Sequence, residues 1–174
     1  VSLCVPEYSI LGFLGPNGAG KTTFMKMLMG LVKPSSGSGT VFGLDIVKDS
    51  VKIRERVGYL SQNPKFIDHM TARENILLIA RFFNIGNDQD VLNRSKSLLK
   101  KVGREHKANR PVKGFSGGEK QRFCIAIALV NNPELLILDE PAAALDTVGR
   151  EDVLEIIKSL KGNTTVFYST HILD

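Results

Sequence analysis

Short apolar segments alternate along this chain with longer segments of helical spacing. Residues 10–14 (ILGFL) and 135–139 (LLILD) are almost continuously apolar, which is typical of strands buried on both faces of a sheet. Residues 57–61 and 164–169 predict two further strands, and residues 40–42 predict a short one. The pattern therefore predicts a sheet of several short strands.

Between these strands, apolar positions recur at helical spacing. Helices are predicted over residues 23–31, 75–83, 90–102, 116–131 and 146–160. Thr71 with Glu74, and Ser116 with Glu119, form capping boxes that predict two of the helix starts. The basic residues 103–114 predict a loop. Strands separated by helices favour an α/β fold with a mostly parallel sheet flanked by helices.

The composition is that of an ordinary globular domain. The chain has 174 residues, of which 43% are hydrophobic and 24% charged, which suits one domain with a sizeable core. The net charge is +5, but the basic residues are scattered, so we expect a solvated surface. No apolar run is long enough to span a bilayer. Cys4 and Cys124 lie among apolar residues without metal-binding spacing, so we expect a buried, reduced pair.

Residues 15–22 (GPNGAGKT) match the phosphate-loop pattern GxxxxGK[ST], between a predicted strand and a predicted helix. Glycines let backbone N–H groups curve around a phosphate, and the helix presents its positive end. Lys21 can reach the β- and γ-phosphates, and Thr22 can offer its hydroxyl to Mg²⁺. A glycine-rich turn matching by chance is the weaker alternative. The residues expected to contact nucleotide are Gly15, Pro16, Asn17, Gly18, Ala19, Gly20, Lys21, Thr22 and Thr23.

Two carboxylates follow the apolar run at residues 135–138. Asp139 is expected at the C-terminal end of a buried strand, where ligands gather in an open α/β sheet, and would hold Mg²⁺ through water. Glu140 could orient or deprotonate the attacking water. Adjacent carboxylates are otherwise common on surfaces, so the interpretation depends on the strand before them and on the phosphate loop.

Gly117 and Gly118 open the helix predicted after Ser116. A capping box explains Ser116 and Glu119 but not the glycines, which each disfavour a helix by about 1 kcal/mol. Glycines leave room for a ligand at the helix N-terminus, and that end attracts anions. Because the chain already has a phosphate loop, this turn is predicted to face the γ-phosphate of a nucleotide held by another copy.

With these motifs together, the sequence resembles the nucleotide-binding domains of ABC ATPases. GPNGAGKTT resembles their Walker A motif, FSGGEKQR their signature motif and LLILDEP their Walker B motif, in the family's order and over nearly the whole chain. The resemblance implies a P-loop NTPase fold with ATP and Mg²⁺ as cofactors. It also implies a head-to-tail dimer that sandwiches two ATP molecules. In that dimer, Ser116, Gly117 and Gly118 complete the site of the other copy.

Two further roles rest on the resemblance alone. Gln62, in YLSQNP, resembles the Q-loop glutamine, which implies contact with Mg²⁺ or water. His171, in STHILD, resembles the switch histidine, which implies contact with the γ-phosphate. Ala144-Leu145-Asp146 resembles the D-loop. Without the family, an isolated glutamine or histidine after a strand carries no functional signal.

A finer resemblance, to ABC-2-type and drug- or lipid-exporter ATPases, runs from SSGSG to HMTARENI. It implies transmembrane permease subunits as partners, a second ATP-binding domain, no nucleic acid, and a cytoplasmic position on the inner face of the cell membrane. Residues 1–62 would form the first part of the α/β core, 63–115 an inserted α-helical subdomain, and 116–174 the remaining core. Lys65, Phe66 and Ile67 are either docking residues or, for the two apolar ones, subdomain core.

The chain also departs from the family's pattern. Glu119 replaces the usual glutamine and adds a negative charge near a phosphate site. Tyr8 stands where the family usually has a turn glycine, so a positive φ there would be strained. The family's adenine-stacking aromatic would lie before Val1, and its strands after the switch histidine are absent. We therefore expect a domain truncated at both ends.

The leading interpretation is an ATP-hydrolysing subunit that powers a membrane transporter. An ABC ATPase of DNA repair would carry coiled coils or zinc modules in residues 63–115, which have neither heptads nor a CxxC pair. A translation-type ABC protein would carry two such domains in one chain. An unrelated P-loop kinase or GTPase would lack the signature and switch motifs. The transported substrate is not encoded in these motifs.

Overall fold

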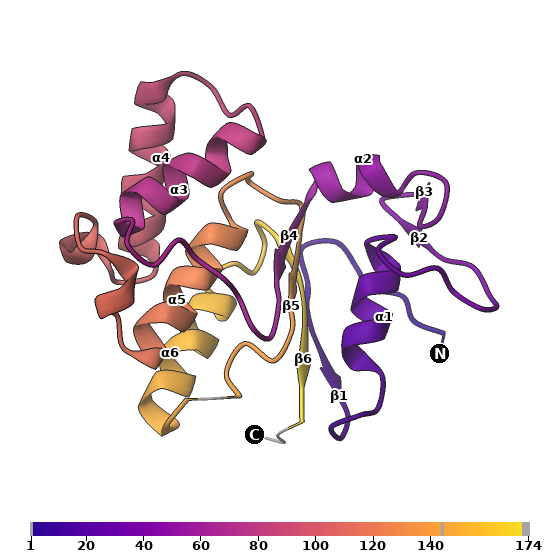
Figure 1. The fold of residues 1–174 in the computed structure, drawn as a ribbon. Coiled ribbons are helices and arrows are strands. Elements are labelled where there is room, and N and C mark those ends of the chain that lie inside the picture. Colours follow the sequence, from indigo (N-terminus) through magenta and orange to yellow (C-terminus); the bar gives the residue numbers. More distant parts are fainter. Residues whose placement is uncertain (1, 144, 172–174) are drawn as a thin grey trace.

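The structure, a computed structural model, describes residues 2–143 and 145–171. Its centre is a parallel four-stranded sheet in the order β1 (Ile10–Leu14), β6 (Thr165–Thr170), β5 (Leu135–Leu138) and β4 (Val57–Leu60) (Figure 1). The predicted parallel sheet is confirmed, and the order brings the two ends of the described chain together at β1 and β6.

Helices cover both faces of this sheet (Figure 1). One face packs against α1 (Lys21–Leu28), and the other against α5 (Gly117–Ala128) and α6 (Thr147–Lys158). Side chains of β5 alternate between the faces, because successive residues of a strand point to opposite sides. Leu135 and Ile137 join the apolar cluster beside α1, whereas Leu136 and Leu138 join the cluster beside α5 and α6.

A helical segment lies between β4 and α5, at the upper left of Figure 1. It contains α3 (Ala72–Phe82), α4 (Asp88–Lys101) and the two short 3-10 turns η1 (Glu105–Lys107) and η2 (Val112–Gly114). The predicted capping box of Thr71 and Glu74 starts α3. Buried residues of this segment and of the sheet belong to one continuous apolar cluster, so the division at residues 62 and 115 stays a prediction.

A small hairpin and a short helix lie beyond α1. Strands β2 (Thr40–Val41) and β3 (Leu44–Asp45) pair antiparallel, and α2 (Ser50–Glu55) follows them. The strand predicted over residues 40–42 ends one residue early, because Phe42 (φ 57°) and Gly43 (φ 74°) both turn into the left-handed region. Two successive residues with positive φ are typical of a tight hairpin turn. The pairing with β3 was not predicted.

Three sequence-based expectations about single residues have different outcomes. Tyr8 has φ 57°, as its place in a glycine turn predicted, and its N–H donates to Thr165 Oγ1 at 2.9 Å. Cys124 is buried, but Cys4 is exposed, so the expected buried pair is wrong for Cys4. Its segment precedes β1 and lies outside the sheet. Phe66 packs on Phe123 with ring centroids 5.3 Å apart, which supports its assignment to the core.

In the described part of the chain, no helix is long and apolar enough to cross a bilayer.

Candidate functional site

The phosphate loop connects β1 to α1. Its first residue is fixed to the end of the neighbouring strand, because Gly15 N–H donates to Thr170 O at 3.1 Å. Gly18 (φ 81°) and Gly20 (φ 87°) are left-handed, and nothing lies within 4 Å of where a Cβ would stand on either. Among the described residues, no side chain caps the N-terminus of α1. The loop thus combines an open surface with helix N–H groups that lack a side-chain acceptor.

Lys21 places its ammonium inside this loop. The residue is only 7% exposed, and its Nζ donates to Gly15 O at 2.6 Å and to Pro16 O at 3.1 Å. The same Nζ lies 3.1 Å from Glu140 Oε1. The phosphate loop therefore holds a positive charge. The carboxylate of Glu140, which the sequence predicts to be catalytic, lies against that charge.

Asp139 is fully buried at the end of β5. Its Oδ2 accepts a hydrogen bond from Thr22 Oγ1 at 2.7 Å, which joins two of the three residues predicted to hold Mg²⁺. Its Oδ1 accepts a hydrogen bond from Ser169 Oγ at 2.8 Å. Both carboxylate oxygens are thus held by hydroxyl groups, which fixes their direction at the carboxyl end of the sheet.

Ser169 is a site residue that sequence analysis missed. Besides its bond to Asp139, its Oγ accepts the N–H of Glu140 at 2.8 Å, so one hydroxyl orients both acidic residues. The signal in the sequence was a polar residue in the β6 segment next to His171, but its direction depends on the pairing of β5 with β6. That pairing cannot be read from either segment alone.

Glu140 has a strained backbone, and its carboxylate has two close neighbours. Its φ of 52° lies in the left-handed region, which costs a non-glycine residue about 1–3 kcal/mol and is commonly found at functional sites. Its Oε2 lies 2.7 Å from His171 Nδ1, while Oε1 faces Lys21. Lys21, Glu140 and His171 therefore form a continuous row of charged and polar groups. His171 is partly exposed, so the row reaches the surface.

A cavity of about 320 Å³ lies over this arrangement. Its lining combines the loop with Gln62, which is exposed after β4, and with Glu140. The lining residues are Asn17, Gly18, Ala19, Gly20, Lys21, Thr22, Thr23, Gln62 and Glu140. Most of the residues predicted to bind nucleotide thus line one space, together with two of the three predicted catalytic residues.

The donor set fits Mg²⁺ as a companion of phosphate. Within residues 2–143 and 145–171, no three His, Cys, Asp or Glu side chains are grouped in a way that could hold a metal ion. Thr22 and Asp139 instead supply one hydroxyl and one carboxylate, already 2.7 Å apart. Mg²⁺ commonly takes one or two carboxylates from the protein and its other ligands from waters and substrate phosphates. The described residues fit a Mg²⁺ ion that takes most of its ligands from waters and phosphates rather than from protein side chains.

The second glycine pair lies elsewhere. Ser116, Gly117 and Gly118 do not line the cavity. Ser116 starts α5 with the predicted capping box, in which its Oγ accepts Glu119 N–H at 3.3 Å and its own N–H donates to Glu119 Oε2 at 3.0 Å. A Cβ on Gly117 would meet nothing within 4 Å. The turn is thus open at Gly117.

The predicted D-loop is described only in part. Ala144 lies outside the described residues, while Asp146 caps α6 by accepting the N–H of Gly149.

The ABC transporter family model matches residues 1–143. The chain belongs to the ABC transporter family. The bacitracin transport ATP-binding protein BcrA of Bacillus licheniformis is 43% identical over 175 residues, which are 99% of this chain and 56% of that protein. The ABC transporter ATP-binding protein NatA of Bacillus subtilis is 37% identical, over 100% of this chain and 71% of that protein. This ABC transporter chain spans about half of BcrA, and about a fifth of the matched Arabidopsis thaliana A-family members.

Solved structures of ABC proteins have the same fold as this ABC transporter chain. An ATP-binding cassette solved as a dimer in a post-hydrolysis state, bound to ADP and Pi, superposes with a TM-score of 0.86 at 30% identity. The match covers 98% of this chain and 78% of that one. The protein cbiO1 of Clostridium perfringens, part of the ABC transporter complex cbiONQ, has a TM-score of 0.87 at 29% identity. That match covers 99% of this chain and 70% of the other.

Proposed function

We propose that this chain is an ATP-binding and ATP-hydrolysing subunit that powers a membrane transporter. The observation that carries the proposal is the cavity in which the phosphate loop, Gln62 and Glu140 meet, with the Lys21 ammonium held between loop carbonyls and a carboxylate. Bound Mg²⁺-ATP supplies a γ-phosphoryl group whose transfer to water needs positioning and charge neutralisation more than covalent chemistry from the protein.

Each residue of the site has a physical role in such a reaction. The Lys21 ammonium binds phosphate oxygens, which are stronger acceptors than the two loop carbonyls because they are charged. Thr22 and Asp139 would hold Mg²⁺, directly or through water, and Gln62 lines the same cavity as Thr22. Ser169 keeps Asp139 and Glu140 in fixed directions.

Glu140 is the proposed general base, and His171 acts beside it. Glu140 is 8% exposed, so its carboxylate is largely shielded from bulk water. One of its oxygens faces Lys21 and the other His171. The carboxylate accepts a proton from the attacking water, and the imidazole orients it from the partly exposed side and reaches the γ-phosphate.

We also propose that two such domains work as a head-to-tail pair on transmembrane permease subunits. Ser116 and Gly117 are exposed, and the Ser116–Gly118 turn does not line the cavity of its own chain, as expected for a role at the site of a second copy. A related cassette is a dimer, and cbiO1 is part of a transporter complex. The names of BcrA and NatA place both proteins in transport, which supports a transport role. The exporter type and a cytoplasmic position on the inner membrane face belong to the same proposal. Residues 63–115, with exposed Lys65, would then form the subdomain that contacts the permease.

Replacement of Glu140 by glutamine tests this proposal. The amide keeps the size of the side chain but cannot accept the proton, so ATP hydrolysis should slow at least roughly a hundredfold, within the range of general-base catalysis. Binding of Mg²⁺-ATP should persist, because Lys21 and the loop are unchanged. Turnover by phosphate release and affinity by calorimetry are the two measurements. Loss of binding with unchanged turnover per bound ATP would contradict the proposed role.

A further inference from the structure

The signature turn (residues 116–119) contains an acidic residue close to the place where the proposed function requires a phosphate. Glu119 lies in the first turn of α5, three positions after Ser116. A carboxylate there stabilises the helix start, but it repels a nucleotide that approaches the same helix end. A glutamine could form the same capping box without that repulsion. The negative charge therefore needs a compensating feature elsewhere in the chain.

Two basic residues from the segment after α4 surround the Glu119 carboxylate. Lys107 Nζ forms an ion pair with Oε1, and Arg104 Nε lies 3.9 Å from the same oxygen. The other oxygen, Oε2, accepts the N–H of Ser116 at 3.0 Å. The Glu119 side chain is only 14% exposed. Its hydrogen bond with Lys107 holds the pKa of Glu119 below its usual value, despite the opposing effect of burial.

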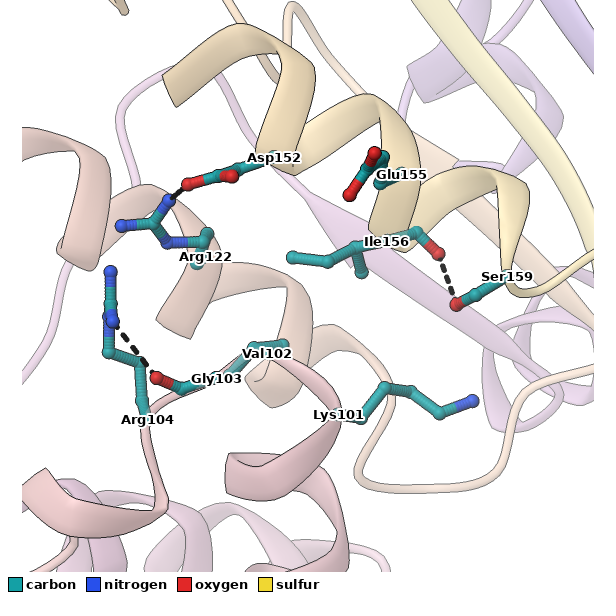
Figure 2. Close-up of a pocket in the computed structure, with 9 residues that line it drawn as sticks. All are labelled: Lys101, Val102, Gly103, Arg104, Arg122, Asp152, Glu155, Ile156 and Ser159. Carbon is teal, nitrogen blue, oxygen red and sulfur yellow. Dashed lines mark hydrogen bonds and ion pairs between the residues drawn. The ribbon is translucent and has the colours of Figure 1, made fainter. Parts of the chain in front are cut away.

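The two cations are themselves held in place. Arg104 donates from Nη1 to Gly103 O at 2.9 Å, and Lys107 Nζ lies 5.8 Å from the centre of the Phe115 ring. Figure 2 shows Arg104 beside α5, next to Arg122, whose guanidinium turns instead to Asp152 of α6. Arg122 therefore belongs to a separate ion pair at the edge of a cavity of about 310 Å³. The side chains of Lys107 and Arg104 are 18% and 15% exposed.

We infer that Lys107 and Arg104 are positioning residues that neutralise Glu119, so that the signature turn can accept the phosphate of a nucleotide held by a second copy. The inference rests on the proposed head-to-tail pair. It adds a requirement to that proposal, because a capping carboxylate at residue 119 is compatible with phosphate only when η1 supplies the opposite charge. Lys107, with the shorter contact, carries most of this effect.

Four variants of the full chain test the inference. Lys107→Met leaves Glu119 with only the more distant Arg104, so association driven by a non-hydrolysable ATP analogue should weaken about tenfold, which corresponds to about 1.4 kcal/mol. Glu119→Gln should associate at least as tightly as the parent protein, because it removes the negative charge and leaves both cations. The double variant Lys107→Met with Glu119→Gln should recover the parent affinity, because it removes both charges. Lys113→Met, which removes an exposed lysine without an ion pair among the described residues, is the matched control.

The dissociation constant is measured by analytical ultracentrifugation at several salt concentrations, with a thermal melt of each variant. Recovery in the double variant, and a defect in Lys107→Met that lessens at high salt, support the inference. If the ion pair of Lys107 and Glu119 only stabilised the fold, the double variant would also melt at a lower temperature than the parent protein. Its association would then stay as weak as that of Lys107→Met. An unchanged Lys107→Met, or a double variant as weak as Lys107→Met, overturns the inference. If the parent protein does not associate with the analogue, the proposed pair itself is wrong.

Discussion

The side chain of Lys21 is nearly buried, and three oxygen atoms lie around its ammonium group. Two of these are carbonyls of its own loop, and one belongs to Glu140. An ammonium in that position needs acceptors on several sides, because a buried charge without partners is costly. The loop residues were predictable from the sequence, since Gly15, Gly18 and Gly20 with the lysine and threonine that follow form the loop locally. The contact with Glu140 was not, because it depends on β1 and β5 both pairing with β6 in the sheet.

We expect Lys21→Ala to abolish measurable Mg²⁺-ATP binding while the fold is retained. The substitution removes the ammonium that faces phosphate, and it leaves the Glu140 carboxylate paired only with His171. Isothermal calorimetry gives the affinity, and circular dichroism shows whether the helices remain. Lys26→Ala, which removes a lysine from the last turn of the same helix, is the matched control, because Lys26 does not line the cavity. Parent-like affinity in folded Lys21→Ala would show that the loop binds phosphate without it.

The two cysteines should differ in reactivity. Cys124 is buried in α5 and donates its S–H to Lys120 O at 2.9 Å, and burial raises the pKa of its thiol to about 12. The thiolate is the reactive form, so Cys124 should resist maleimide at pH 8, whereas exposed Cys4 should react. Mass spectrometry should find one adduct on the native parent protein and none on native Cys4→Ser. The denatured parent protein should carry two. Rapid double labelling of the native protein would contradict the burial of Cys124.

At the scale of elements, local signals fixed helix starts better than strand details. The capping boxes at Thr71 and Ser116 were readable because both partners lie within four residues. A third box, Asn87 with Asp90, starts α4 two residues before the predicted helix. The β2–β3 hairpin was missed because each strand has only two residues, too few for a period to show. The exposure of Cys4 was missed because an apolar neighbourhood in sequence does not place a segment against the sheet.

The capping box of α3 should contribute measurably to stability. Thr71 Oγ1 accepts Glu74 N–H, and Glu74 Oε2 accepts Thr71 N–H at 2.7 Å. Thr71→Ala removes the first bond, so the free energy of unfolding should fall by about 1 kcal/mol. Thr71→Ser should retain it. Ser97→Ala, at an exposed position inside α4, serves as the control with little effect. Equal urea midpoints for Thr71→Ala and Ser97→Ala would mean that the cap is energetically unimportant.

At the scale of the whole molecule, the proposed site is shared between two chains. Ser116→Arg should leave each chain able to bind ATP, because Ser116 does not line its cavity. The added side chain would occupy the space required by the phosphate of the second copy, so association and hydrolysis should fail together. A role for Ser116 only as a helix cap predicts a loss of stability instead, with ATP hydrolysis intact in the folded protein.

Mixing Ser116→Arg with Lys21→Ala makes the test sharper. In a head-to-tail pair of the two variants, one site contains both substitutions and the other contains neither, so part of the ATPase activity should return. Each variant alone should be inactive. Phosphate release is measured across a range of mixing ratios, with a maximum expected near equal amounts. Activity that is only the sum of the two separate proteins would exclude a site shared in this way.

The pairing of β1 with β6 also bears on how the molecule is made. Ile10 pairs with Val166, and Gly15 N–H at the start of the phosphate loop donates to Thr170 O. At a ribosomal rate of about 5–20 residues per second, β1 leaves the ribosome on the order of ten seconds before β6 exists. During that time α1 can already pack on β1 through Phe13 and Phe24, but the edge of β1 that pairs with β6 has no native partner. The hydrogen bond that anchors the start of the phosphate loop can therefore form only after synthesis has passed Thr170.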